Sequence, residues 1–217
     1  MDGLLASGAK VAILVNPNAP TGLLLDSGEV ERLVDRFPGL VVIDEAYMDF
    51  APAGSSAMKL VEKVSNLIVL RTFSKSYSLS GARVGYSVAA PELSAALDKG
   101  KDIYNVNALS ARLALAALED RDYLLDTADK IIRTREANTR RFLAAGFGVL
   151  PSAANFLLCR VPEEGNAREA LRLYEGLAGQ GVYVRYFDHP RLCDKLRISV
   201  GTDEEMERLW QALLALL

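Results

Sequence analysis

Short apolar runs alternate with amphipathic segments along the first half of the chain. The runs Val11–Val15, Leu40–Ile43 and Leu67–Leu70 have the length and composition of buried strands. Ser27–Phe37 spaces its apolar residues along one face of a helix, with Ser27 as the candidate N-cap, and residues 57–64 predict a shorter helical stretch. Apolar strands that alternate with helices predict an α/β fold, with a mostly parallel sheet covered by helices on both faces.

The second half of the chain follows a different pattern. Residues 84–89 and 91–99 predict one more strand and helix, and the long helical pattern of residues 109–145 breaks near residues 120–122. A smaller α+β unit follows, with a helix over residues 167–178, a C-terminal helix from Asp203, and strands near residues 147–150, 155–160, 182–186 and 196–200. We therefore predict three parts, which are a partial large domain over residues 1–115, connecting helices over 116–145 and a small domain over 146–217.

Charge and composition narrow the function classes. The formal net charge is −3, from 25 Lys and Arg against 28 Asp and Glu, so we expect no broad basic surface for nucleic acid or an anionic membrane. No apolar run reaches the roughly 18 residues of a membrane helix, and the first residues lack a signal-peptide pattern. We expect a soluble, cytoplasmic protein that acts on small molecules.

The thiols and the imidazole do not indicate a metal site. Cys159 and Cys193 are far apart in the sequence, and neither lies in a Cys-x-x-Cys motif or near a histidine at ligand spacing. We interpret them as two isolated thiols without a disulfide. His189, the only histidine, stands between Asp188 and Pro190 beside a turn signal, and we assign it to a loop rather than to catalysis.

Polar residues follow each of the three buried strands of the first half. The motifs are NPNAPTG at residues 16–22, DEAY at residues 44–47 and RTFSK at residues 71–75. In parallel α/β sheets, ligands bind beyond the carboxyl ends of the strands. We therefore expect these three segments to contribute to one site.

Lys75 is the candidate nucleophile. An amine attacks a carbonyl only in its unprotonated form, and a desolvated pocket or a nearby positive charge favours that form. The hydroxyls of Thr72 and Ser74 and the guanidinium of Arg83 would hold a phosphate by charge-assisted hydrogen bonds, as a phosphorylated aldehyde cofactor requires. The alternative is that Lys75 is a surface lysine in a serine-rich loop.

Asp44 and Tyr47 fit the same chemistry. A carboxylate at the end of the neighbouring strand pairs with a protonated pyridine nitrogen and keeps the ring an electron sink. Tyr47 would offer its phenol to a ring oxygen, and Asn18 is a candidate for a similar contact from the first strand end. Taken alone, Asp44 is also consistent with a helix cap behind a strand.

Two arginines of the second half are candidates for substrate binding. Arg197 stands within the otherwise apolar run of residues 196–200, where a guanidinium costs free energy unless an anion meets it. The planar guanidinium, with its paired N–H donors, suits a carboxylate or a phosphate. Arg185 is a second candidate for that role. An interdomain ion pair is the alternative for each.

Five motifs, taken in order, resemble the fold type I pyridoxal-phosphate aminotransferases, and most closely the histidinol-phosphate aminotransferases. They are NPNAPTG, DEAYMDF, RTFSKSYSLSGARVGY, PSAANFLL and LRISVGT, and the resemblance covers essentially the whole chain. It implies a fold type I large domain, pyridoxal 5'-phosphate as cofactor, and an α+β small domain.

By this resemblance the candidate residues take specific roles. Lys75 would form the Schiff base with the cofactor and then move the proton between the substrate α carbon and the cofactor. Asp44 would pair with the pyridine nitrogen, and Tyr47 would donate to the phenolic oxygen. The remaining contacts would be to the cofactor phosphate, from Ser74, Arg83 and Thr72, and to the anionic group of the substrate, from Arg197 and Arg185.

The implied reaction moves an amino group between L-histidinol phosphate and 2-oxoglutarate in two half reactions. The implied partners are a small-molecule amino donor, a 2-oxo acid and a second copy of the chain in a homodimer, with Tyr104 and Asn105 near the interface. The alternatives are an aromatic aminotransferase, a threonine-phosphate decarboxylase and a catalytically silent fragment.

The chain departs from the family in two places. The family asparagine stands directly before Pro-Thr-Gly, where this chain has Ala19, so Asn18 would have to replace it. Family members also carry a long segment ahead of the first strand, which supplies a phosphate-binding turn and an aromatic ring that stacks on the cofactor. We therefore expect a chain that begins partway through the large domain, with an exposed sheet edge and uncovered apolar surface.

Overall fold

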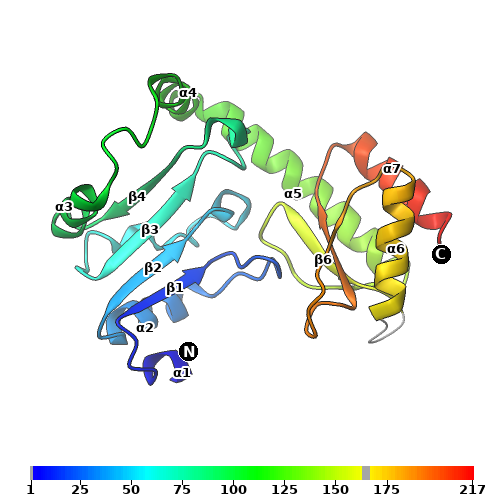
Figure 1. Cartoon of the computed structure of the whole chain (residues 1–217), viewed down its shortest axis with the longest axis horizontal. Coiled ribbons are helices and arrows are strands. Elements are labelled where there is room, and N and C mark those ends of the chain that lie inside the picture. Colours follow the sequence, from blue (N-terminus) through cyan, green and yellow to red (C-terminus); the bar gives the residue numbers. More distant parts are fainter. Residues whose placement is uncertain (1, 163–166) are drawn as a thin grey trace. The chain divides into compact units, whose positions relative to one another are not determined.

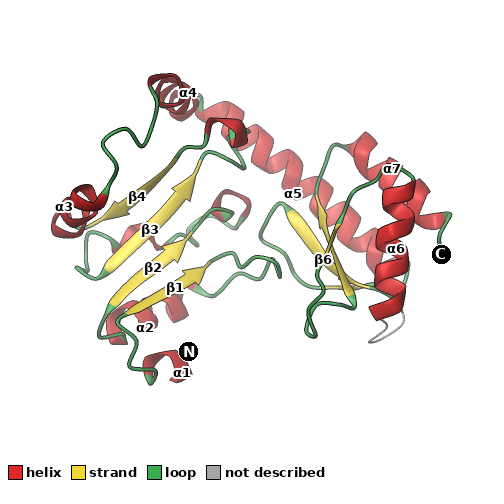
Figure 2. Cartoon of the chain, viewed as in Figure 1, coloured by secondary structure: helices red, strands yellow, loops and turns green. Residues whose placement is uncertain are grey.

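The computed structural model describes residues 2–162 and 167–217, which form two compact units. Unit 1 comprises the described residues up to 19 together with residues 24–128, and unit 2 comprises residues 20–23 and the described residues from 129 onward. Each unit has its own sheet and its own apolar core. Figures 1 and 2 show the order of the elements along the chain.

Unit 1 is built on a four-stranded sheet in the order β1-β2-β3-β4 (Figure 1). Strands β1, β2 and β3 are parallel, and β4 is antiparallel to β3. The strands are β1 (Val11–Val15), β2 (Leu40–Asp44), β3 (Leu67–Thr72) and β4 (Gly85–Ala89). The predicted α/β fold with a mostly parallel sheet is confirmed.

Helix α2 and short 3-10 turns connect these strands, whereas α1 precedes β1 and α3 to α5 follow β4. The predicted helix over residues 57–64 is a short 3-10 turn, Ala57–Leu60, and the predicted break in the long helical pattern falls between α4 and α5. Helix α5 begins in unit 1 and continues into unit 2. The helices are α1 (Asp2–Leu5), α2 (Ser27–Arg36), α3 (Pro91–Gly100), α4 (Ala108–Glu119) and α5 (Arg121–Ala144).

The N-cap of α2 differs from the prediction. The carboxylate of Asp26 accepts a hydrogen bond from the backbone N–H of Gly28 at 2.8 Å, so Asp26 is the cap and Ser27 is the first helical residue. An ionised carboxylate at this position also interacts favourably with the positive end of the helix dipole.

Helix α2 covers one face of the sheet of unit 1. Its buried residues Val30, Leu33 and Val34 join alternate strand residues in one core cluster, whose strand members include Ala12, Val41, Ile43, Leu67 and Val69. Side chains alternate between the two faces of a strand, so their neighbours Val11 and Ile13 point to the opposite face.

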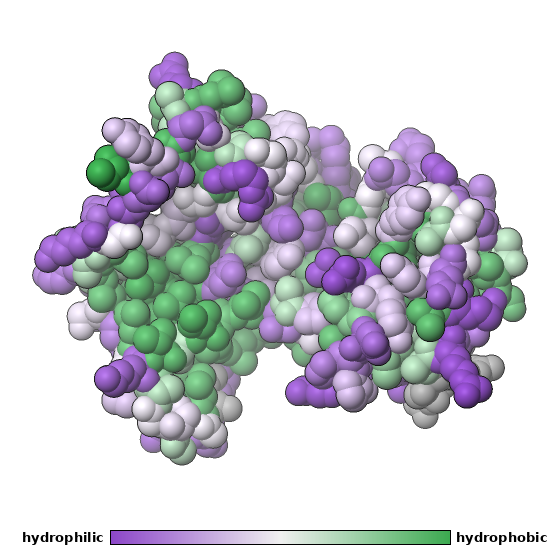
Figure 3. Space-filling model, in the orientation of Figure 1, coloured by the Kyte–Doolittle hydropathy of each residue, from purple (hydrophilic) through white to green (hydrophobic). Residues whose placement is uncertain are grey.

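That opposite face of β1 is open among the described residues. Val11 is 47% exposed and Ile13 is 68% exposed, and Figure 3 shows a continuous apolar area where strands β1 to β3 lie in Figure 1. The prediction of helices on both faces, made from the apolar strands, is therefore wrong for β1. The uncovered apolar surface expected from the family resemblance is confirmed.

Unit 2 contains an antiparallel sheet in the order β5-β6-β8-β7. Its elements are β5 (Gly148–Val149), β6 (Phe156–Arg160), β7 (Arg185–Tyr186), β8 (Lys195–Ser199), α6 (Ala167–Gly179) and α7 (Asp203–Leu214). The strand predicted over residues 182–186 is shorter than expected, because only its last two residues pair with β8. Residues 182–184 instead line a cavity opposite residues 198–200.

The core of unit 2 is centred on Trp210 of α7. Trp210 is almost fully buried, its ring lies 4.4 Å from that of Phe142, and its Nε1 donates to Oδ1 of Asn138 at 2.8 Å. Helix α7 begins with a capping box between Thr202 and Glu205, which satisfies two backbone N–H groups. The aromatic contact and the indole hydrogen bond tie α7 to α5.

Both cysteines are free thiols, as predicted. Cys159 is fully buried in β6, and burial raises the pKa of its thiol, whereas Cys193 is only half-buried in a loop. His189 lies exposed in the same loop, where its Nδ1 accepts from the backbone N–H of Arg191. No helix among the described residues is long and apolar enough to span a bilayer.

The two thiols should differ in reactivity. We expect brief iodoacetamide treatment of the folded protein at mildly alkaline pH to label Cys193 and to spare Cys159, because only a solvent-accessible thiolate reacts. Peptide mass spectrometry measures the two sites separately. Labelling in denaturant serves as the control, and equal labelling of both thiols in the folded state would contradict the burial of Cys159.

Candidate active site

The parallel strands of unit 1 end at one edge of the sheet. The register pairs Val15 with Asp44 and Asp44 with Leu70. Beyond it, the N–H of Asn16 donates to the carbonyl of Asp44, and the N–H of Glu45 donates to the carbonyl of Leu70, each at 2.9 Å. The three polar segments that follow β1, β2 and β3 therefore start side by side.

Lys75 and Tyr47 meet at this edge. Lys75 is half-buried in the loop after β3, and its Nζ lies 5.4 Å from the centroid of the Tyr47 ring. An ammonium over an aromatic face is held by attraction to the ring quadrupole. The structure thus brings together the two side chains for which the sequence suggested an amine and a phenol next to one cofactor.

Asp44, the last residue of β2, is half-buried. Its Oδ1 accepts from the backbone N–H of Ala46 at 3.0 Å, which orients the carboxylate. An ionised carboxylate has about four acceptor positions, so this bond is compatible with a second, charged donor. Asn18 is half-buried in the segment after β1.

The three candidate phosphate ligands are close to Lys75 in sequence. Oγ1 of Thr72 accepts from the backbone N–H of Ser74 at 3.1 Å, which closes the turn just ahead of Lys75. Arg83 is exposed, and its Nη1 donates to the carbonyl of Ser80 at 2.9 Å. Arg83 also has a φ of 55°, which is uncommon for a residue with a side chain.

An aromatic cluster supports the Lys75 loop from inside. The buried ring of Phe73 lies 4.9 Å from that of Tyr77 and 5.6 Å from that of Tyr86. Oγ of Ser110 in α4 donates to the carbonyl of Ala82 at 2.8 Å and ties the far end of the loop to that helix. The loop is therefore fixed at several points.

The sequence analysis assigned no role to four charged or polar residues near Lys75. Glu45, Asp49, Arg71 and Ser76 form a connected set of ion pairs and hydrogen bonds. All four lie within the motifs DEAYMDF and RTFSKSYSLSGARVGY, and Arg71 is the polar residue of a strand that is otherwise apolar up to Thr72. That last feature was the available signal.

The candidate substrate residues lie together in unit 2. Arg197 of β8 is paired with Arg185 of β7 across the ladder. The guanidinium of Arg197 lies 5.2 Å from the ring centroid of Phe156 and 5.8 Å from that of Phe187, and the guanidinium of Arg185 lies 5.5 Å from the latter. Phe187 is thus shared by both arginines.

This arrangement is unfavourable without an anion. Two positive side chains that face each other across an antiparallel pair destabilise the sheet. In addition, Nε of Arg197 is buried and has no hydrogen-bond partner among the described residues. A buried donor without a partner costs roughly 1–3 kcal/mol, which a bound carboxylate or phosphate would offset.

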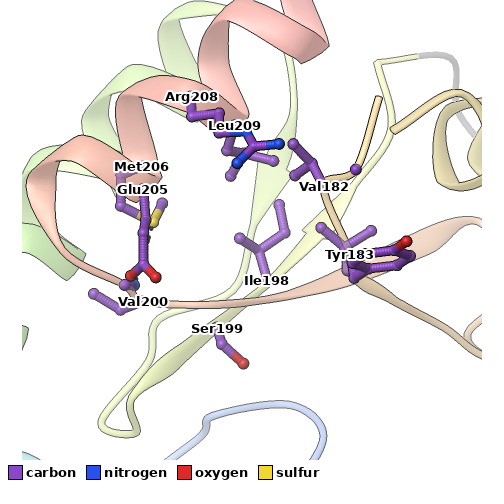
Figure 4. A pocket seen from close by; sticks show the side chains of 12 residues that line it. Val182, Tyr183, Ile198, Ser199, Val200, Glu205, Met206, Arg208 and Leu209 are labelled. Carbon is purple, nitrogen blue, oxygen red and sulfur yellow. Dashed lines mark hydrogen bonds between the residues drawn. The ribbon is translucent and has the colours of Figure 1, made fainter. Parts of the chain in front are cut away.

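A cavity of about 420 Å³ lies elsewhere in unit 2, between β8, α7 and residues 182–184 (Figure 4). Neither Arg185 nor Arg197 lines it. The two charged side chains that line it are hydrogen-bonded to the backbone. Glu205 accepts from the N–H of Thr202, and Arg208 donates to the carbonyl of Gln180. The cavity is therefore separate from the candidate substrate residues.

Comparison with known proteins decides the family. The model of the family described as aminotransferase class I and II matches residues 1–213 of the 217. The chain belongs to this family. The resemblance to fold type I pyridoxal-phosphate aminotransferases is thereby confirmed.

Relatives within the aminotransferase family extend well beyond this chain. Histidinol-phosphate aminotransferase of Geotalea uraniireducens (strain Rf4) is 43% identical over 94% of this chain and 57% of its own length. The crystal structure of histidinol-phosphate aminotransferase from Sinorhizobium meliloti in complex with pyridoxal-5'-phosphate matches with a TM-score of 0.91 and 32% identity, over 99% of this chain and 60% of that one. The chain spans under two thirds of either relative.

A solved structure whose name states another activity is also similar. L-threonine-O-3-phosphate decarboxylase from Porphyromonas gingivalis matches with a TM-score of 0.80 and 25% identity, over 96% of this chain and 65% of that one. The fold of this family is therefore compatible with more than one reaction.

The tyrosines under the Lys75 loop should make the stability of the protein depend on alkaline pH. Burial raises the pKa of Tyr77 and of Tyr86, and the negative charge of Asp49 adds to the effect on Tyr77. The unfolded chain then loses these protons at a lower pH than the folded chain does. The free energy of unfolding should therefore fall as pH rises above about 10. Urea unfolding at a series of pH values measures this slope.

Tyr77→Phe should flatten that slope, because phenylalanine has no proton to lose. Tyr183→Phe is the matched control, since Tyr183 is 83% exposed and lies in unit 2, away from the aromatic cluster under the Lys75 loop. An unchanged slope in Tyr77→Phe would show that the phenol titrates alike in the folded and unfolded chains.

Proposed function

We propose that this chain is the lysine-bearing part of a pyridoxal-phosphate-dependent aminotransferase that moves an amino group between L-histidinol phosphate and 2-oxoglutarate. The observation that carries the proposal is the 43% identity with a histidinol-phosphate aminotransferase over 94% of the chain. The position of Lys75 over the ring of Tyr47, in the loop beyond the strand next to Asp44, supports the same chemistry.

The residues at the sheet edge of unit 1 fit pyridoxal phosphate by the chemistry of their side chains. The amine of Lys75, the carboxylate of Asp44 and the phenol of Tyr47 match an aldehyde, a pyridine nitrogen and a phenolic oxygen. When bound, the cofactor supplies an electron sink for the substrate α carbon. Lys75 would hold the aldehyde covalently, and its freed Nζ would then carry the proton removed from the α carbon.

The phosphate of the cofactor would bind at the start of the Lys75 loop. Thr72 and Ser74 supply hydroxyls directly ahead of Lys75. Arg83 would exchange its bond with the carbonyl of Ser80 for a phosphate oxygen, which is the stronger, charged acceptor. Asn18 would contribute a contact to the cofactor from the segment after β1, in place of the residue at position 19.

Arg197 would bind the anionic group of the substrate, with Arg185 assisting. The buried Nε of Arg197 and the two facing guanidinium groups support an anion at this place. L-Histidinol phosphate provides a phosphate and 2-oxoglutarate provides a carboxylate, so one pair of arginines would serve both half reactions.

A threonine-phosphate decarboxylase is the second candidate. The similarity to such an enzyme, with a TM-score of 0.80, favours it over other rivals, and its named substrate also carries a phosphate. The arginine pair does not separate the two substrates. The higher identity to histidinol-phosphate aminotransferases makes the transaminase our first choice.

A cytoplasmic homodimer is part of the same proposal. The segment between α3 and α4 exposes large apolar side chains, with Ile103 at 86% and Tyr104 at 88%, and Leu109 of α4 is also exposed. Exposed apolar residues that cluster in one segment are typical of a protein interface. Tyr104 and Asn105 would lie near the contact between the two copies.

Covalent binding of the cofactor tests the role of Lys75. Pyridoxal phosphate added to the chain and reduced with borohydride should leave a stable adduct on the peptide that contains Lys75, and Lys75→Ala should remove it. Lys101→Ala, a change at an exposed lysine, is the control and should leave the adduct on Lys75 unchanged. If the intact chain forms no adduct at Lys75, it is a silent fragment rather than a cofactor-binding one.

Substrate choice is tested by steady-state assays with L-histidinol phosphate, phenylalanine and threonine phosphate. Arg197→Met should lower kcat/KM for histidinol phosphate by roughly a hundredfold, because charge-assisted hydrogen bonds contribute about 1.5–3 kcal/mol each. Arg160→Met, a change at another partly buried arginine of the same sheet, is the control. Turnover of threonine phosphate alone would replace our substrate assignment by the decarboxylase.

A further inference from the structure

A chain of buried ionic contacts lies directly beneath the Lys75 loop. It consists of Glu45, Arg71, Asp49 and Ser76, which come from the ends of β2 and β3 and from the turns that follow them. The Glu45 side chain is 0% exposed, that of Arg71 is 13% exposed and that of Asp49 is 15% exposed. None of these four residues has a role in the reaction proposed above.

Glu45 anchors one end of this chain of contacts. Its carboxylate accepts from Oγ of Ser56 and from the backbone N–H of Ala57, each at 2.6 Å, and pairs with Nη1 of Arg71 at 3.2 Å. A fully buried carboxylate requires such partners, because removing a charge from water costs several kcal/mol unless it is paired and hydrogen-bonded. Glu45 therefore holds Arg71 in a fixed position at the end of β3.

Asp49 links that anchor to the loop. One carboxylate oxygen binds Nη2 of Arg71, and the other accepts the hydroxyl of Ser76. Ser76 is almost fully buried and directly follows Lys75, whereas Asp49 lies two residues after Tyr47. One carboxylate therefore contacts the immediate neighbour of Lys75 and stands in the same turn as Tyr47.

We propose that Glu45, Arg71 and Asp49 are positioning residues, which hold the amine of Lys75 in its place beside the ring of Tyr47. This inference rests on the proposed function, in which the amine and the phenol meet one cofactor. The separation of 5.4 Å between Nζ of Lys75 and the Tyr47 ring depends on how the turn at residues 47–50 is placed against the Lys75 loop. The carboxylate of Asp49 joins this turn to the loop through side chains.

Ionic contacts suit this task better than apolar packing. An apolar contact tolerates small displacements, whereas a guanidinium between two carboxylates loses its paired geometry when either one shifts. The aromatic cluster of Phe73, Tyr77 and Tyr86 fills the space under the Lys75 loop. The ionic contacts would fix the position of the loop above that cluster. A shift of about 1 Å in a reacting group is enough to reduce a rate strongly.

Two variants break the link at different atoms. Asp49→Asn removes the charge that Arg71 needs, and Ser76→Ala removes the hydroxyl that Asp49 accepts. Ser76→Thr keeps the hydroxyl and serves as the rescue variant. Val34→Ala is the stability control, because Val34 lies on the buried face of α2 in the core of unit 1 and takes no part in the ionic contacts.

The first readout is hydrogen exchange of the loop backbone. The N–H of Ser78 donates to the carbonyl of Lys75 at 2.9 Å, and the N–H of Leu79 donates to that of Phe73 at 3.0 Å. Asp49→Asn and Ser76→Ala should each speed exchange at these two amides by at least about tenfold, as expected for the loss of a hydrogen bond to a charged group. Ser76→Thr should remain close to the unmodified protein.

The second readout is borohydride trapping of pyridoxal phosphate at Lys75 over a range of pH. Both link-breaking variants should trap less cofactor and shift the pH midpoint of trapping, whereas Val34→Ala should change neither at a temperature where it is folded. Unchanged exchange and trapping in both variants would overturn the proposal, and so would an equal change in Val34→Ala.

The two readouts separate the failure of this inference from that of the proposed function. If the unmodified chain traps no cofactor at Lys75, the proposed function fails for this chain, and the exchange readout alone then decides. Faster exchange at Ser78 and Leu79 in both link-breaking variants would still support positioning by Asp49. Unaltered exchange would still refute it.

Discussion

The hydrogen-bonded register of three parallel strands determines where the candidate chemistry of unit 1 lies. Asp44 is paired with Val15 on one side and with Leu70 on the other, so the segments after β1, β2 and β3 leave the sheet at the same level. A slip of one residue would turn every side chain of β2 to the opposite face and would bury Asp44 in the α2 core. Packing of the apolar face on α2 prevents such a slip, because the slip would bring the polar side chain of Asp44 among Val30, Leu33 and Val34.

Two arginines in the protein occupy contrasting surroundings. Arg71 is held by two carboxylates of its own chain, so its charge is balanced within unit 1. Arg197 stacks on two aromatic rings and faces a second arginine, and its buried Nε has no partner among the described residues. The two carboxylates around Arg71 fit the positioning role proposed for it. The buried Nε of Arg197 fits the anion binding proposed for that residue.

Much of the fold was predictable from the sequence because its strands are continuous apolar runs. The starts of β1, β2 and β3 were predicted to the residue, since each is a short, continuous apolar run with polar or turn-forming residues around it. The cap of α2 was misplaced by one residue because both Asp26 and Ser27 are good caps. The strand at residues 182–186 was overpredicted because its apolar residues line a cavity instead of pairing.

The site was predictable only in part. Lys75, Asp44 and Tyr47 stand in recognisable motifs at strand ends, whereas the link from Asp49 to Ser76 joins residues 27 positions apart and depends on the tertiary structure. The environment of the sole tryptophan is likewise a tertiary property. Trp210 is buried against Phe142 in unit 2, so its fluorescence reports the surroundings of that unit directly. Unit 1, which carries Lys75, has no tryptophan, so an unfolding curve recorded by tryptophan fluorescence follows unit 1 only where the two units unfold together.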